Sequence, residues 1–80
     1  MSETKIWEDP AQDARVVCYS KGKNHTITLE ARGKVFGEWK TTADSFDPDM
    51  SRDQALKGVA EGIVRHAARC AVTIPPDFGM

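Results

Sequence analysis

The sequence predicts an α+β fold in which a three-stranded antiparallel meander is followed by one helix packed on one face of the sheet. Residues 25–31 alternate between apolar and polar side chains, which is typical of a strand with one buried face. Residues 52–71 repeat apolar side chains at helical spacing, and Pro75 and Pro76 prevent the helix from continuing. The 80 residues form a single domain with an acidic extended arm (1–13), a sheet (14–41), a helix (51–71) and a tail (72–80).

Three segments rich in β-branched and aromatic residues are the expected strands: 14–20, 25–31 and 35–41. The intervening turns contain Gly22 and Asn24, and then Arg32 and Gly33, which are residue types found in tight hairpin turns. The arm offers only Ile6 and Trp7 as apolar anchors. The expected core side of the sheet consists of Val16, Cys18, Ile27, Leu29, Val35 and Trp39.

The helix is expected to begin at Ser51. Gln54 follows three residues later, as in a capping box, and Asp53 favours the positive end of the helix. A helical wheel places an apolar stripe within about 60° of Leu56. That stripe contains Val59, Ala60, Ile63, Ala67 and Cys70, and we expect it to face the sheet.

The composition is that of an ordinary globular protein, with 40% hydrophobic and 29% charged residues and a formal net charge of −1. These values exclude a disordered acidic tail and a strongly basic nucleic-acid arm. No apolar stretch is long enough to span a membrane, and the first residues lack the apolar core of a signal peptide. We therefore expect a cytoplasmic protein without a membrane partner.

The residues that could carry catalysis or bind a metal come singly from four places in the chain: Cys18, His25, His66 and Cys70. Zinc needs three or four converging ligands, so we expect no metal and no other cofactor. Both cysteines are expected to be reduced thiols, although a pairing across the fold stays open. The acidic loop at 44–49 lacks the glycine and distal glutamate of an EF-hand, which favours a solvated loop. No nucleophile has a base motif beside it, so we expect no enzyme and no catalytic residue.

The sheet face away from the helix is the first candidate binding surface. Residues 15–40 contain six basic and two acidic residues, a net charge of +4. Arg15, Tyr19, Phe36 and Lys40 are expected on this face, together with Val17, Thr26, Thr28, Glu30 and Glu38. Aromatics among cations resemble single-stranded RNA platforms, but the two glutamates disfavour phosphate. A protein partner, a second copy, or the arm with Trp7 could cover the apolar residues here.

The outer side of the helix is the second candidate surface. Gly58 and Gly62 each cost about 1 kcal/mol relative to alanine inside a helix, and the wheel turns both away from the sheet, beside Arg65 and Arg69. Bare backbone would let a partner approach closely, and the arginines could hold carboxylates or phosphates. The alternative is a helix that is merely suboptimal.

Two known protein families share features with this sequence. Double-stranded RNA-binding domains share the β-β-β-α order, but the helix here opens at 51–57 without their Lys-Lys-x-Ala-Lys cluster. In size and format the whole chain resembles the small anti-CRISPR inhibitors of phages and mobile elements. These are single α+β domains without catalytic motifs, which block a larger complex by covering its surface.

The resemblance implies an inhibitor that blocks a CRISPR effector of the Cascade type, a larger protein or ribonucleoprotein complex. The alternative is a small nucleic-acid-binding module that uses Arg15, Lys21, Lys23 and Lys40. A third hypothesis is an accessory chain of an enzyme, inactive alone. In each case we expect a monomer or weak homodimer.

Overall fold

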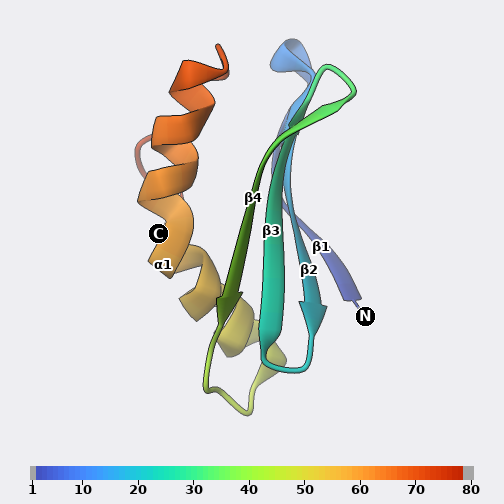
Figure 1. The fold of residues 1–80 in the computed structure, drawn as a ribbon, viewed down its shortest axis with the longest axis vertical. Coiled ribbons are helices and arrows are strands. Elements are labelled where there is room, and N and C mark those ends of the chain that lie inside the picture. The colour runs from blue at the N-terminus through green and yellow to red at the C-terminus, as the bar shows by residue number, and fades with distance from the viewer. Residues whose placement is uncertain (1, 79–80) are drawn as a thin grey trace.

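The computed structural model describes residues 2–78 and shows a four-stranded antiparallel sheet followed by one long helix (Figure 1). The strands β1 (Ser2–Asp9), β2 (Ala14–Lys21), β3 (Asn24–Ala31) and β4 (Lys34–Thr42) lie side by side in sequence order. A short 3-10 helix, η1 (Pro10–Gln12), joins β1 to β2, and α1 (Pro48–Arg69) packs against β3 and β4. The predicted α+β class is confirmed, but the predicted number of strands is wrong.

The additional strand, β1, lies where the sequence predicted an extended arm. It pairs with β2 from Ser2 opposite Ser20 to Asp9 opposite Ala14. A register shift between Lys5 and Trp7 marks a bulge, and both Ile6 and Trp7 pack against the core cluster between sheet and helix. The alternative in which the arm covers the other face of the sheet is therefore wrong.

A second bulge lies in β4 and reverses two of the predicted orientations. Leu29 is opposite Gly37 and Glu30 is opposite Val35, so Phe36 is the extra residue. A one-residue shift moves a side chain to the other face of a sheet. Val35, predicted in the core, is 60% exposed, and Phe36, predicted on the open face, packs against the core.

The core lies between the sheet and α1 and is completed by the tail. Its sheet side contains Val16, Cys18, Ile27 and Leu29, as predicted, and its helix side contains Leu56, Ala60, Ile63 and Ala67. The tail has no regular structure, yet Val72, Ile74 and Phe78 are buried in this cluster. The Gln12 side chain fixes the tail because it donates to the Thr73 carbonyl and accepts from the Thr73 N–H.

The helix begins three residues before the predicted start. Asp47 is the N-cap, since its Oδ1 accepts from the N–H groups of Asp49 (2.9 Å) and Met50 (3.2 Å), and Pro48 takes the first helical position. The predicted cap, Ser51, is instead buried inside the first turn. At the other end Ala71 adopts a left-handed φ of +58°, and the Val72 N–H donates to the Ala67 carbonyl. Within residues 2–78, no helix has the long run of apolar residues that crossing a bilayer requires.

Candidate binding surfaces

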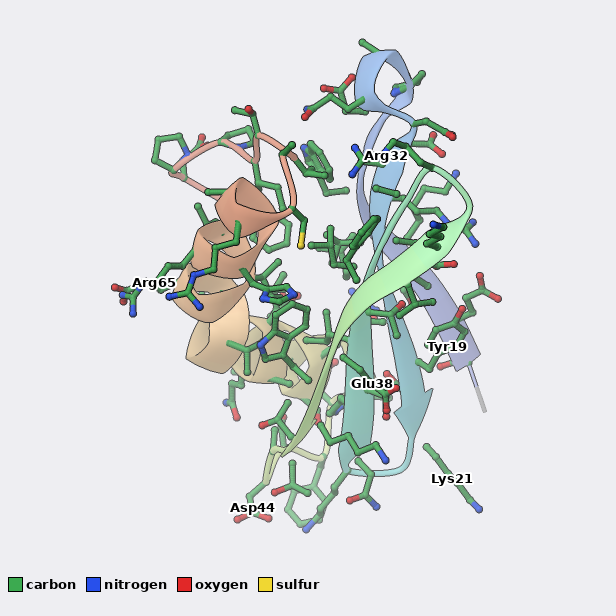
Figure 2. All side chains as sticks on the ribbon, turned by 45° about the horizontal axis from the view of Figure 1, so that its top comes forward. Tyr19, Lys21, Arg32, Glu38, Asp44 and Arg65 are labelled. Carbon is green, nitrogen blue, oxygen red and sulfur yellow. The ribbon has the colours of Figure 1, made fainter. Side chains whose placement is uncertain are left out.

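The predicted binding residues lie on two opposite sides of the molecule and do not form one site. Figure 2 shows Arg65 projecting from α1 away from the sheet, whereas Tyr19 and Glu38 lie on the far side of the strands. The strand register places Arg15, Tyr19 and Lys40 on that far side, here called the open sheet face. Its fifteen paired positions are Glu3, Lys5, Glu8, Arg15, Val17, Tyr19, Lys21, Asn24, Thr26, Thr28, Glu30, Val35, Glu38, Lys40 and Thr42.

Arg15 and Lys40, the two basic residues predicted as binding residues of the open sheet face, are paired with neighbouring carboxylates. Arg15 makes a two-point contact with Glu30, at 3.2 Å from Nε to Oε2 and 3.4 Å from Nη2 to Oε1. The Glu30 carboxylate raises the pKa of Arg15 through this hydrogen bond and its charge. Lys40 Nζ is 3.5 Å from Glu38 Oε1. A nucleic-acid backbone would have to displace these carboxylates, so the pairing disfavours phosphate binding here.

The apolar part of the open sheet face is smaller than the sequence suggested. Val17 is only 1% exposed although it points away from the helix. Its neighbours on this face include Lys5, Arg15 and Tyr19, whose long side chains can lie over it. With Phe36 on the helix side, Tyr19 is the aromatic residue that remains, and it is half-buried.

On the outer side of α1 the two predicted glycines differ. A Cβ at Gly58 would meet nothing within 4 Å, so this position is bare backbone open to solvent. A Cβ at Gly62 would lie 3.7 Å from Trp39 Nε1. The prediction that neither glycine contacts the sheet is therefore wrong for Gly62, which borders the tryptophan of β4. Arg65 and Arg69 are exposed, and Arg65 hydrogen-bonds to Glu61.

A groove of about 580 Å³ runs between α1 and the C-terminal tail. Its walls are Lys57, Ala60, Glu61, Val64, Arg65, Pro76 and Phe78, and this set is called the α1–tail groove below. Ala60 and Phe78 are buried and Val64 is half-buried, so they form an apolar floor. Lys57, Glu61 and Arg65 are exposed and form a charged rim. The helical wheel did not predict this groove because one wall comes from the tail, which has no periodicity.

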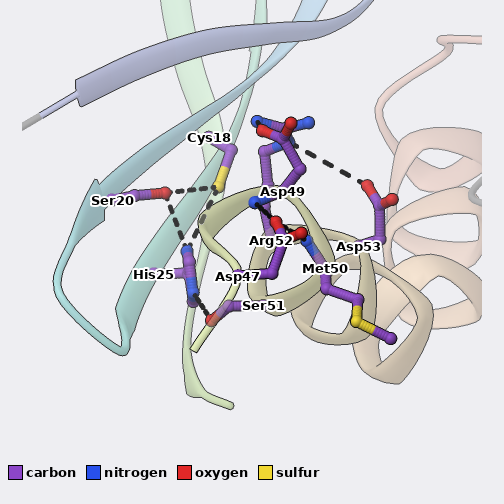
Figure 3. Close-up of polar contacts among 9 residues, drawn as sticks. All are labelled: Cys18, Ser20, His25, Asp47, Asp49, Met50, Ser51, Arg52 and Asp53. Atoms are coloured by element: carbon purple, nitrogen blue, oxygen red, sulfur yellow. Dashed lines mark hydrogen bonds and ion pairs between the residues drawn. The ribbon is translucent and has the colours of Figure 1, made fainter. Parts of the chain in front are cut away.

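A buried polar cluster connects the sheet to the first turn of α1 (Figure 3). His25 Nδ1 is 2.7 Å from Ser20 Oγ, and His25 Nε2 is 2.6 Å from Ser51 Oγ. Cys18 Sγ lies 3.6 Å from Ser20 Oγ and 4.0 Å from the imidazole. A thiol, an imidazole and hydroxyls are the groups of a nucleophilic site, but His25 is 2% and Ser51 1% exposed. At this depth the cluster supports packing rather than contact with a substrate.

His66 makes a second link between helix and sheet. Its Nε2–H donates to the Phe36 carbonyl in the β4 bulge, and its ring meets Trp39 edge-on with centroids 5.7 Å apart. Cys70 Sγ is 3.8 Å from the same nitrogen.

The four residues that come singly from four places in the chain therefore form two pairs in the fold, Cys18 with His25 and Cys70 with His66. Both cysteines are free thiols. Within residues 2–78 no group of three or more histidine, cysteine or acidic side chains is placed to hold a metal.

Comparison with known proteins adds no further information about these surfaces. No family model matches the sequence, and no curated protein or solved structure is significantly similar to it.

Proposed function

We propose that this chain is a small non-catalytic inhibitor that binds a larger protein or ribonucleoprotein complex and blocks it by covering its surface, as anti-CRISPR proteins do. The α1–tail groove is the observation that carries this proposal. Of the predicted helix residues the groove contains Arg65, and its volume of about 580 Å³ is large enough to receive an apolar side chain of a partner.

The groove has the arrangement of a protein-binding site. A partner's apolar side chain would contact Ala60, Val64 and Phe78, and burial of such an anchor is the main source of affinity in most protein interfaces. The rim carries both signs of charge, since Lys57, Glu61 and Arg65 follow one another at four-residue spacing along the α1 side of the recess. Mixed charges at a rim set orientation and discriminate between partners.

The rest of α1 supports docking along its outer side. Gly58 leaves the backbone bare at a position that is open to solvent, so a partner's main chain can approach closely. The nucleic-acid alternative has weaker support, because three of its four residues, Arg15, Lys23 and Lys40, lie within 3.5 Å of a carboxylate. The buried position of His25 and its partners supports a role without catalysis.

The direct test measures binding of the purified chain to a purified Cascade-type effector complex by co-elution and biolayer interferometry. Val64→Glu places a charge in the apolar floor of the groove and Arg65→Glu reverses the rim, and we expect both to weaken binding at least about tenfold. Lys21→Glu, at the distant β2–β3 turn, is the matched control and should bind like the wild type. Circular dichroism of each variant separates loss of binding from loss of folding.

Two outcomes would contradict the proposal. One is absence of binding to the effector complex together with unimpaired target interference in cells that express the chain. The other is tight binding to a DNA or RNA oligonucleotide whose affinity falls steeply with salt, which would support the nucleic-acid alternative.

A further inference from the structure

The loop between β4 and α1 contains Phe46, whose side chain exposes more apolar surface than any other in the described part of the protein. Phe46 is 99% exposed, and Met50, in the first turn of α1, is 56% exposed. Scattered exposed leucines or valines are common on protein surfaces, but a phenylalanine with almost no protein contact is unusual. Neither side chain contributes to the core cluster.

The loop is held at both ends. The Ala43 N–H donates to the Lys23 carbonyl on one side, and Asp47 caps the helix on the other. The Asp47 N–H also donates to Ser45 Oγ at 3.3 Å. Lys23 Nζ lies 5.6 Å from the centre of the Phe46 ring. Phe46 is therefore presented on a short, fixed turn, which reduces the entropy lost when it binds.

The charge around Phe46 is acidic. Asp44, Asp47, Asp49 and Asp53 lie within this loop and the first turns of the helix, and Figure 2 shows Asp44 at the same end of the molecule as Lys21. Two of the cations at this end of the molecule are already engaged. Lys23 pairs with Asp44 at 3.5 Å, and Arg52 pairs with Asp49 at 3.1 Å (Figure 3). The four carboxylates outnumber Lys21, Lys23 and Arg52, so the surface around the ring has an excess of negative charge.

We infer that this acidic knob (Asp44, Phe46, Asp47, Asp49 and Met50) docks into an apolar pocket of a partner protein whose rim carries lysine or arginine. Phe46 is the anchor, and the aspartates select the partner by charge complementarity. The same negative charge repels nucleic acids and anionic membranes, which favours a protein as the occupant. The inference does not depend on the α1–tail groove, because the groove and the knob share no residue.

Site-specific crosslinking tests the inference with the full chain. A photoreactive benzoyl-phenylalanine is placed at Phe46, and the chain is irradiated in lysate of the cells that naturally express it. Exposed Lys34, the first residue of β4, carries the same group in the control. We expect one protein to be crosslinked from position 46 and not from position 34, at a peptide bordered by basic residues, and excess unmodified chain should compete.

The identified partner is then purified for affinity measurements. Phe46→Ala should weaken its binding at least about 30-fold, the range of interface anchors, and Phe46→Leu should weaken it less. Asp44→Lys with Asp49→Lys should also weaken binding, and added salt should lower the affinity of the wild type. Phe46→Ala should leave the melting temperature unchanged because the ring has almost no contacts.

The inference is overturned if no protein is crosslinked, if the crosslink joins two copies of this chain or a nucleic acid, if the target site is not basic, or if Phe46→Ala binds as tightly as the wild type. Parallel measurement of Val64→Glu distinguishes the two proposals. Loss of binding by Val64→Glu with unchanged binding by Phe46→Ala would refute the knob and leave the groove in place.

Discussion

Ser51→Ala tests the connection between the sheet and the start of α1. The change removes the hydroxyl 2.6 Å from His25 Nε2 and leaves that nitrogen buried without its partner, at a cost of about 1–3 kcal/mol. Alanine is the better helix former by roughly 0.5 kcal/mol, which offsets part of the loss. We expect the free energy of unfolding to fall by about 1–2 kcal/mol, or the melting temperature by roughly 4–16 °C.

Urea unfolding followed by circular dichroism measures this effect. Gln54→Ala, at an exposed position of the same helix, is the control and should change the free energy of unfolding by less than about 0.5 kcal/mol. In a His25→Leu background the Ser51 hydroxyl has lost its imidazole partner, so Ser51→Ala should then be neutral or stabilising. If Ser51→Ala alone, with His25 unchanged, is as stable as the wild type, the reasoning is refuted.

The same urea titration tests three backbone sites. Gly58→Ala should raise the free energy of unfolding by up to about 1 kcal/mol, because the new Cβ meets nothing within 4 Å. Gly37→Ala should lower the free energy of unfolding by about 1–3 kcal/mol, because the new Cβ would lie 2.6 Å from the Trp39 ring. Equal effects of Gly58→Ala and Gly37→Ala would contradict the placement of Trp39. Ala71 has a left-handed φ that glycine adopts without strain, so Ala71→Gly should raise the free energy of unfolding by up to about 1 kcal/mol. A loss of stability would contradict the left-handed conformation at this end of the helix.

The two proposed binding surfaces differ in shape and position. The α1–tail groove is a recess beside α1, and the acidic knob is a protrusion formed by the β4–α1 loop and the first turn of the helix. The open sheet face, in contrast, satisfies much of its own charge through Arg15–Glu30 and Lys40–Glu38. Pairs of this kind reduce the attraction of a face for a charged partner.

The sequence contained reliable signals for those elements that short-range chemistry determines. The strand at 25–31 alternates clearly and becomes β3, and the turns at Gly22 and Gly33 have the positive φ that glycine permits. The stripe from Leu56 to Ala67 faces the sheet as predicted, because helical periodicity is a local property. The α+β class follows from these elements alone.

Elements that depend on distant partners were missed or misplaced. Strand β1 is an edge strand with charged residues on its exposed side, so its alternation is weak and only pairing with β2 makes it a strand. Asp47 and Ser51 are both acceptable N-caps by residue type. The imidazole of His25 holds Ser51 inside the fold, and Asp47 is left to cap the helix.

By itself, then, the sequence determined the fold class, β2 to β4 as strands and the buried face of α1, because each depends on neighbouring residues. Only the tertiary structure decided the β4 bulge that exchanges Val35 and Phe36, the closing of the α1–tail groove by Phe78 and the exposure of Phe46. Each of these depends on contact, or the absence of contact, with residues far along the chain, and local propensity contains no information about such contacts.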